Sequence, residues 1–314
     1  MAGCIEKMTK VFIDGSAGTT GLRIYDRLKE REDLELLILE GENRKDPAAR
    51  AAALDSADIA FLCLPDAAAR EDAALISDPD TVIIDTSTAH RTAEGWAYGF
   101  PELKGRREEI ACSKRIANPG CHASGFISLI APLTENGIIA ADAELSCFSL
   151  TGYSGGGKKM IAEYEGEGKD ALLEGPRMYG LSQVHKHIPE MLVQTGLKVQ
   201  PAFCPVVADF YAGMEVVVPL FRESIKASAD EIKEIYREYY KCGLVKYIDG
   251  ADEAGFLSAA AFAGRDDMQI SVFGSEENII LVSRFDNLGK GASGAAIQNM
   301  NIVLGIDEAS GLNI

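Results

Sequence analysis

Cys121 follows a Pro-Gly pair and precedes an apolar run in IANPGCHASGFISLIAPL, residues 116–133. Pro119 and Gly120 favour a turn, and the spacing of the apolar residues predicts a helix after it, with the thiol at its N-terminus. The unpaired N–H groups and the dipole of that helix are expected to lower the thiol pKa below its free value of about 8.5. Most cysteines near a helix start are structural, so a nucleophilic role requires a base and anion-binding groups nearby.

Two histidines stand two residues apart in HKHIPE, residues 185–190. Pro189 is typical of the first turn of a helix, so His185 and His187 are expected just before one. Residues two apart do not share a helix face, so one imidazole could bind substrate while the other moves protons. A solvated surface pair is the alternative. Metal binding is the weaker functional interpretation because no Cys-rich or carboxylate-rich partner has ligand spacing, and we expect no metal.

Further groups that could bind anions come from three loops. Ser87 and Arg91, in IIDTSTAHRT, follow the end of a predicted strand, where ligands of open α/β sheets gather. Arginine there could hold a phosphate or carboxylate through two hydrogen bonds. Glycine-rich loops recur at 151–159 (TGYSGGGKK) and 289–294 (GKGASG). Such loops are usually only turns, but beside a candidate nucleophile they favour an anion-handling site.

The loop GSAGTTG, residues 15–21, lies between a predicted strand and a predicted helix. Backbone N–H groups in this position can hold a pyrophosphate. The candidate residues are Gly15, Ser16, Gly18, Thr19, Thr20 and Gly21. Their spacing is GxxGxxG and not the commoner GxGxxG, so a glycine-rich turn without a ligand is the alternative.

The choice between NAD and NADP depends on the residues after the second predicted strand. Glu40 would favour a free ribose 2′-hydroxyl. Arg44 and Lys45 follow directly and could pair with a 2′-phosphate. These residues alone leave the choice open.

Short apolar runs alternate with helical patterns over the first 90 residues, which predicts a parallel sheet covered by helices on both faces. Strands are expected at 10–14, 34–39, 59–64 and 81–86, and helices at 21–31, 47–54 and 67–76. Longer runs at 143–151, 202–221 and 268–285 then predict a mainly antiparallel sheet. A helix over 228–242 should begin with a capping box of Ser228 and Glu231. The last helix, 293–306, is expected to return to the first domain.

Composition limits the classes of function. The chain has 314 residues, 47% hydrophobic and 25% charged, with a net charge of −17, so a folded protein that does not bind nucleic acid or an anionic membrane is expected. There is no run of about 18 apolar residues, and the N-terminal MAGCIEKMTK lacks a signal-peptide core, which favours the cytoplasm. The seven cysteines lack paired spacing, so disulfides are not expected, and Cys63 and Cys147 are interpreted as core residues.

Taken together, these motifs resemble the short form of N-acetyl-γ-glutamyl-phosphate reductase, a relative of aspartate-semialdehyde dehydrogenase. The similar segments are GSAGTTG, YGFPEL (98–103), NPGCHAS, TGYSGGGKK, HKHIPEM and KGASGAAIQNMN, in the family's order along nearly the whole chain. The resemblance implies a Rossmann-like NADP domain, residues 1–119 and 292–314, and a catalytic and dimerisation domain similar to that of glyceraldehyde-3-phosphate dehydrogenase, residues 120–291. It also implies a homo-oligomer, either a dimer or a tetramer.

The resemblance further implies reduction of N-acetyl-γ-glutamyl phosphate by NADPH through a thioester on Cys121. His187 would be the acid/base and His185 its assistant, although their roles could be exchanged. The implied cofactor-binding residues are those of the 15–21 loop with Arg44, Lys45, Pro65, Ser154, Gly155 and Asn299. The implied substrate-binding residues are Ser87, Arg91, Asn118, Lys158 and Glu190, and DTSTAHR departs from the long-form pattern around the first two.

Two other functions remain in competition. Aspartate-semialdehyde dehydrogenase would share the cysteine, the cofactor and the reaction type, with a smaller substrate that carries no acetyl group. A cofactor-sensing binding protein would belong to a different class. The presence of Cys121 with both histidines argues against such a protein.

Overall fold

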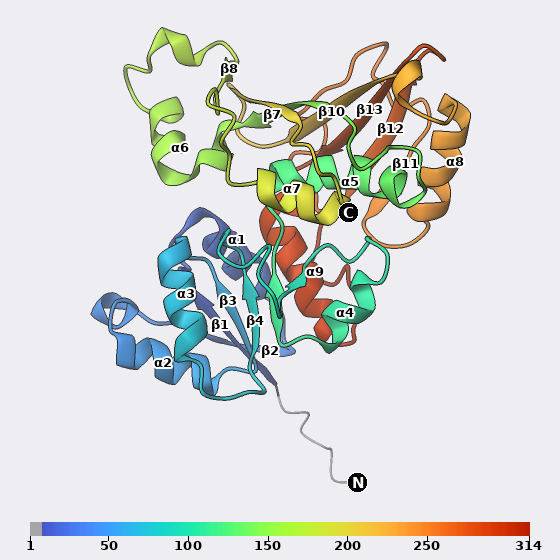
Figure 1. Cartoon of the computed structure of the whole chain (residues 1–314). Coiled ribbons are helices and arrows are strands. Elements are labelled where there is room, and N and C mark those ends of the chain that lie inside the picture. Colours follow the sequence, from blue (N-terminus) through green and yellow to red (C-terminus); the bar gives the residue numbers. More distant parts are fainter. Residues whose placement is uncertain (1–7) are drawn as a thin grey trace.

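The computed structural model describes residues 8–314 and contains two sheets with their helices (Figure 1). Cys4 lies outside these residues. So does most of MAGCIEKMTK, the N-terminal stretch on which the expectation of no export signal rests. Within them, no helix is long and apolar enough to cross a membrane.

The first sheet is parallel, with strand order β2-β1-β3-β4-β6-β5. Its strands are β1 (Thr9–Asp14), β2 (Leu34–Leu37), β3 (Ile59–Leu62), β4 (Val82–Asp85), β5 (Ala97–Tyr98) and β6 (Arg115–Ala117). Its helices are α1 (Thr19–Leu28), α2 (Pro47–Ser56), α3 (Asp66–Leu75) and α4 (Arg106–Cys112). Side chains of α1 and α4 pack on one face, and those of α2 and α3 on the other. The prediction of a parallel sheet covered on both faces is confirmed.

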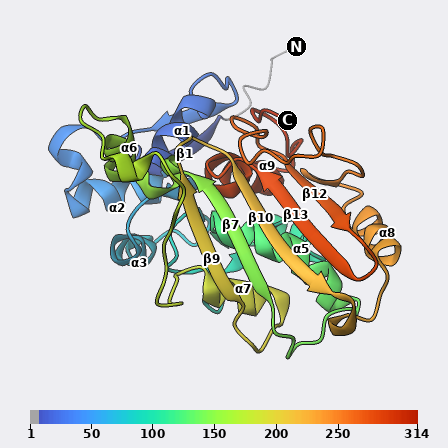
Figure 2. The same cartoon turned by 90° about the horizontal axis from the view of Figure 1, so that it is seen from above.

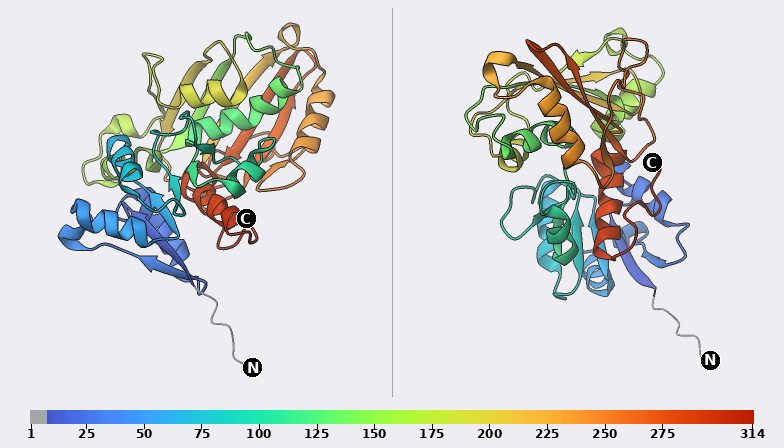
Figure 3. Two further views of the ribbon diagram at one scale, coloured as in Figure 1. Left: turned by 60° about the horizontal axis from the view of Figure 1, so that its bottom comes forward. Right: turned by 90° about the vertical axis from the view of Figure 1, so that its right-hand side faces the viewer.

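Helix α9 (Gly294–Val303), near the C-terminus, packs on the first sheet. Its residues Ile297 and Met300 are fully buried in one cluster with Val11 of β1 and Ile84 of β4. The two views of Figure 3 show α9 alongside the strands of the first sheet.

The second sheet is mixed, with strand order β11-β12-β13-β10-β7-β9-β8. Its strands are β7 (Ser146–Gly152), β8 (Arg177–Met178), β9 (Ala202–Ala208), β10 (Met214–Phe221), β11 (Val245–Tyr247), β12 (Met268–Gly274) and β13 (Asn278–Phe285). Four pairings are antiparallel, whereas β7–β9 and β11–β12 are parallel. The expected run at 202–221 is two strands because β9 ends at Ala208 and β7 lies between it and β10.

Helices α5 (Cys121–Glu135), α7 (Ile188–Thr195) and α8 (Ala229–Tyr239) cover one face of this sheet, and α6 (Gly157–Glu165) lies at its edge (Figure 1). The core contains Phe126 and Ile130 of α5, Met191 of α7 and Tyr236 of α8. The capping box of Ser228 and Glu231 at the start of α8 is confirmed. Cys147 is buried in this core, as predicted, whereas Cys63 is only half-buried in the first domain.

The opposite face of the second sheet is open, and Figure 2 looks onto its strands with α5 and α7 behind them. Phe148 of β7 pairs with Val217 of β10, and Pro219 of β10 pairs with Ile280 of β13. Phe148 and Ile280 are 43% and 38% exposed, so apolar side chains on this face of three neighbouring strands are in contact with solvent. We call these four residues the open sheet patch.

Candidate active site

The loop between β1 and α1 needs glycine for its geometry. Gly15 has φ +79°, and a Cβ there would lie 2.2 Å from the carbonyl oxygen of Cys63. Gly21 packs on the carbonyl of Gly15, which in turn accepts a hydrogen bond from the N–H of Gly18 over 2.8 Å. Gly18 caps α1 without a side-chain hydrogen bond, and no acidic residue lies in the first turn. The N–H groups of this helix start can therefore bind an anion, so the loop fits a dinucleotide pyrophosphate.

A cavity of about 300 Å³ lies beside this loop. Gly18, Thr19, Thr20, Pro65 and Ser87 are in its wall, whereas Gly15, Ser16 and Gly21 form the turn without lining it. Glu40, Arg44 and Lys45 are exposed beyond the end of β2, and Nε of Arg44 donates to the carbonyl of Leu39 over 2.9 Å.

A larger cavity of about 410 Å³ lies between the two sheets. Its wall combines residues from five segments that are far apart in sequence: Thr19, Thr20, Arg91, Asn118, Cys121, Ser154, Gly155, His185 and His187. The structure therefore brings the predicted nucleophile, both histidines and three glycine-rich loops to one place.

Cys121 is the first residue of α5, after the N-cap Gly120, as the Pro-Gly turn predicted. Burial raises the pKa of its thiol, and the positive charge of Arg91 and a hydrogen bond from the N–H of His122 oppose this rise only in part. The direction of the pKa shift is thus opposite to the expected lowering. The reason is the depth of the site, where Gly291 packs directly on Cβ of Cys121.

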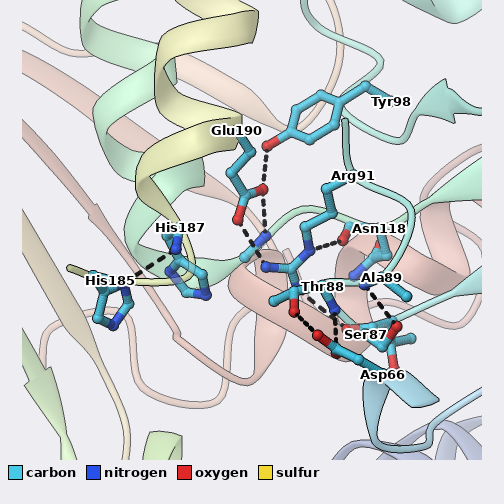
Figure 4. Close-up of polar contacts among 12 residues, drawn as sticks. Asp66, Ser87, Thr88, Ala89, Arg91, Tyr98, Asn118, His185, His187 and Glu190 are labelled. Atoms are coloured by element: carbon cyan, nitrogen blue, oxygen red, sulfur yellow. Dashed lines mark hydrogen bonds and ion pairs between the residues drawn. The ribbon is translucent and has the colours of Figure 1, made fainter. Parts of the chain in front are cut away.

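The two histidines lie at the start of α7, with His187 at the N-cap position and Pro189 in the first turn. Their rings are 4.8 Å apart and nearly perpendicular, and the N–H of His187 donates to Nδ1 of His185 (Figure 4). Burial lowers the pKa of His185 to about 4 and that of His187 well below its ordinary value, with the charges of Lys186 and Arg91 adding to the effect. Both imidazoles are neutral at pH 7. Nδ1 of His187 is buried and has no partner among the described residues.

Arg91 is held from three sides (Figure 4). Its Nε donates to the carbonyl of Asn118 over 2.9 Å, its Nη2 to that of Thr86 over 3.2 Å, and its Nη1 to Oε1 of Glu190 over 2.7 Å. The other carboxylate oxygen of Glu190 accepts from the hydroxyl of Tyr98 and from the N–H of Gly120. A Cβ on Gly120 would lie 2.3 Å from Nη1 of Arg91, so only glycine allows this approach.

Some predicted residues lie behind the cavity walls. Glu190 lines neither cavity, and Asn299 is fully buried, donating to the carbonyl of Gly99 and to Oδ1 of Asn118. Lys158 is exposed at the start of α6 and lines neither cavity. The hydroxyl of Ser87 donates to Asp85 over 2.8 Å, which shapes the loop that carries Arg91.

Three titratable residues in the cavity wall were not predicted: His122, Tyr179 and Lys186. His122 is buried, with Nδ1 and Nε2 each 2.6 Å from a hydroxyl, of Ser149 and Tyr179 respectively, and burial lowers its pKa to about 3. His122 and Lys186 stand inside the quoted motifs NPGCHAS and HKHIPEM and could have been found there. Tyr179 carries no sequence signal.

No group of three or more His, Cys, Asp or Glu side chains within residues 8–314 could hold a metal ion. The six cysteines of this part of the chain are free thiols.

Comparison with known proteins defines the class. Residues 10–112 match the profile "Semialdehyde dehydrogenase, NAD binding domain", and residues 121–287 match "Semialdehyde dehydrogenase, dimerisation domain". The two-domain fold agrees with solved semialdehyde dehydrogenases: aspartate semialdehyde dehydrogenase II of Vibrio cholerae aligns with a TM-score of 0.73 at 17% identity, covering 95% of this chain and 99% of that one. The enzyme of Candida albicans, solved with NADP, aligns with a TM-score of 0.65 at 14% identity, covering 95% and 99%. The chain therefore has the two domains of the semialdehyde dehydrogenase family.

Curated relatives narrow the assignment. "N-acetyl-gamma-glutamyl-phosphate reductase 2" of Nostoc sp. is 44% identical, covering 96% of this chain and 99% of its own. The enzymes of Chelativorans sp. and Brucella ovis, named "N-acetyl-gamma-glutamyl-phosphate reductase", are 45% and 44% identical, each covering 94% of this chain and 98% and 99% of their own. The chain belongs to the N-acetyl-γ-glutamyl-phosphate reductase family, which confirms the resemblance and the oxidoreductase class predicted from sequence.

Proposed function

We propose that this chain reduces N-acetyl-γ-glutamyl phosphate to N-acetylglutamate semialdehyde and phosphate in arginine biosynthesis, with NADPH as the reductant. The observation that carries the proposal is the shared cavity: Cys121, at a helix N-terminus, lies in one wall with His185, His187 and the threonines of the dinucleotide loop. Family membership supports the same reaction.

The first step belongs to Cys121. Its thiolate attacks the acyl carbon, the bond from carbon to the phosphate oxygen breaks, and phosphate leaves with the electron pair, so a thioester remains. The backbone N–H groups at the start of α5 stabilise the oxyanion that forms. The raised pKa of the free thiol implies that a base or the bound ligands must promote ionisation.

The second step needs a hydride, which the nicotinamide supplies when the cofactor is bound. We propose that His187 takes the proton of the Cys121 thiol in the first step and then gives it to the oxygen of the thiohemiacetal, with His185 assisting. Collapse returns the hydroxyl proton to His187, breaks the C–S bond and releases aldehyde and thiolate. A neutral His187 can accept the proton in the reverse direction, and its lowered pKa is consistent with that role.

For the dinucleotide, we propose that Gly18, Thr19 and Thr20 form the binding surface with Pro65, Ser154 and Gly155, while Gly15, Ser16 and Gly21 shape the turn. Asn299 is proposed to act through Asn118. Arg44 and Lys45 are proposed to select the 2′-phosphate of NADP. Their exposure beyond β2 leaves them free to do so. The proposed cofactor domain is residues 1–119 with 292–314, and the proposed catalytic domain is residues 120–291.

For the substrate, we propose direct contacts from Arg91 and Asn118, which line the large cavity. Ser87 and Glu190 would act mainly by holding Arg91, and Lys158 would reach the substrate only after a movement of the exposed start of α6.

The test is the reverse reaction, with purified protein, phosphate, an aldehyde and an oxidised dinucleotide. The formation of the reduced dinucleotide is followed by its absorbance. N-acetylglutamate semialdehyde with NADP should give the highest kcat/KM, and Arg44→Ala should narrow the preference for NADP over NAD. A higher kcat/KM for aspartate semialdehyde would transfer the assignment to that enzyme. Dinucleotide binding without turnover of either aldehyde would favour a sensing protein.

We also propose a homo-oligomer joined through the open sheet patch. An exposed apolar face across three strands is unusual for a monomer, and the matched profile is named a dimerisation domain. Light scattering should give a mass above 33.7 kDa for the wild type and a shift toward the monomer for Phe148→Asp. A monomeric wild type would contradict the proposal.

A further inference from the structure

Lys186 lies between the two histidines, at the start of α7, and lines both cavities. On one side of it are Cys121 and His187, and on the other are Gly18, Pro65 and Thr88 of the dinucleotide side. Arg91 is the one other charged residue that lines both cavities within the described chain. Lys186 comes from the catalytic side of the cleft, so it can reach a ligand across the boundary between the sheets.

The two cations differ in how they are paired. Arg91 is buried and its charge is balanced by Glu190 at 2.7 Å. Lys186 is exposed, and among residues 8–314 no carboxylate lies within 4 Å of its Nζ. Of these two cations, Arg91 has a carboxylate in contact that balances its charge, and Lys186 does not.

Its charge nevertheless acts on the surrounding groups. Burial would raise the pKa of Asp66, but hydrogen bonds from Thr88 and the charge of Lys186 leave it below its ordinary value. The same charge favours the thiolate of Cys121 and disfavours protonation of His185. Lys186 thus contributes positive potential on both sides of the cleft.

The ligands of the proposed reaction make such a charge necessary. The acyl phosphate, inorganic phosphate and the dinucleotide are all anions, while the protein carries a net charge of −17. Without a local unpaired cation, the field of the whole molecule would oppose their entry. An exposed lysine on a flexible stem can follow a phosphate as it moves, which a rigidly held arginine such as Arg91 cannot do.

We propose that Lys186 binds a phosphate group in the cleft and thereby sets the affinity for the phosphorylated ligands of the reaction. This inference rests on the proposed function for its substrate. The phosphate can come from the acyl phosphate, or from inorganic phosphate in reverse, or from the dinucleotide pyrophosphate. All three present the same chemistry to an ammonium group.

The experiment compares Lys186→Gln and Lys186→Arg with the wild type. Lys198→Gln is the matched control, because Lys198 is an exposed lysine just after the same helix that lines neither cavity. The KM for inorganic phosphate is measured in the reverse reaction, and the Kd for NADPH by fluorescence. Loss of a charge-assisted hydrogen bond should raise one of these constants by about 10- to 100-fold in Lys186→Gln. Lys186→Arg should recover most of the loss, and Lys198→Gln should stay within about twofold.

The two arms identify the source of the phosphate. A raised KM for phosphate with an unchanged Kd for NADPH assigns Lys186 to the substrate phosphate, and the opposite pattern assigns it to the dinucleotide. In either case the dependence of that constant on salt should weaken in Lys186→Gln, which a purely structural role would not produce. Both constants within twofold of the wild type would overturn the proposal. A wild type that binds NADPH but turns over no aldehyde would refute the proposed function, and the NADPH arm would still test Lys186.

Discussion

Arg91 and Glu190 form a buried ion pair that joins the loop after β4 to the first turn of α7, with Nη1 2.7 Å from Oε1. The side chains are 7% and 1% exposed. Because Glu190 also accepts from Tyr98 and from the backbone of Gly120, one carboxylate fixes the arginine, the tyrosine and the turn before Cys121. The position of the thiol thus depends on a residue outside the cavity.

Glu190→Gln should therefore destabilise the fold. The amide NH2 group must face one of the donors that the carboxylate accepts, and the charge of Arg91 loses its partner, which costs about 3–5 kcal/mol when one member of a buried pair is removed. The free energy of unfolding in urea measures this loss. Glu109→Gln removes an exposed partner of Arg106 and should cost less than about 1 kcal/mol. Equal losses in the two variants would contradict the role given to Glu190.

The thiol of Cys121 should react slowly at neutral pH in the protein without ligands. Burial raises its pKa, so the thiolate fraction at pH 7 is small and grows as pH rises. Alkylation by iodoacetamide, followed at the Cys121 peptide by mass spectrometry from pH 6 to 10, should rise throughout this range. A rate that is already constant from pH 7 upward would show a lowered pKa.

Cys121→Ser should abolish turnover while leaving the Kd for NADPH within about twofold.

The two histidines should contribute unequally. His187→Asn removes the proposed acid/base and should lower kcat by about 10²- to 10⁴-fold, whereas His185→Asn should cause a smaller loss. Since the pKa of His185 is lowered to about 4 and that of His187 is well below its ordinary value, neither should produce an acidic limb of the wild-type pH profile near the ordinary histidine pKa of about 6.5. Steady-state kinetics between pH 5 and 9 test both points. Wild-type rates in both variants would remove the proposed base.

A cluster below the dinucleotide loop should make stability depend on pH. Asp72 is fully buried beside Asp14 and Arg50, and burial with the nearby Asp14 raises its pKa to about 7. The folded protein then holds a proton that the unfolded chain releases near pH 4, so this group's contribution to stability falls as pH rises from about 4 to about 7.

Asp72→Asn should remove that contribution. A tenfold difference in proton affinity corresponds to about 1.4 kcal/mol. The wild type should lose free energy of unfolding between pH 4 and 7, and Asp72→Asn should lose less than the wild type by at least this amount. Glu71→Gln, at an exposed neighbouring position of α3, should keep the wild-type slope. The same slope in Asp72→Asn would show that Asp72 is ionised throughout this range.

Much of the fold could be predicted from the sequence because the local turn and capping residues agree with the spacing of the apolar residues. The apolar strands of the first sheet, the capping box of α8 and the helix that begins at Cys121 are set by neighbouring residues. Family membership was recognisable because several motifs occur in order. The parallel pairing of β7 with β9 was missed, since it depends on the crossover through residues 153–201 and leaves no local pattern.

The site was less accessible to sequence reasoning. The lowered pKa expected for Cys121 came from helix geometry alone, and the surroundings that oppose it include Gly291, 170 positions later in the chain. Tyr179 reaches His122 only through the folded path of β8 and its neighbours. The roles of the individual site residues, the choice of NADP over NAD and the oligomeric state stay predictions.

The chain passes between the two sheets at residues 118–120 and again at 286–293, and both passages touch the surroundings of Cys121. Asn118 ties them together through a hydrogen bond from Nδ2 to the carbonyl of Ala292. A rotation of one sheet relative to the other would therefore pivot beside the sulfur atom. Opening the cleft would widen it most at the rim far from this pivot and would displace the sulfur atom least.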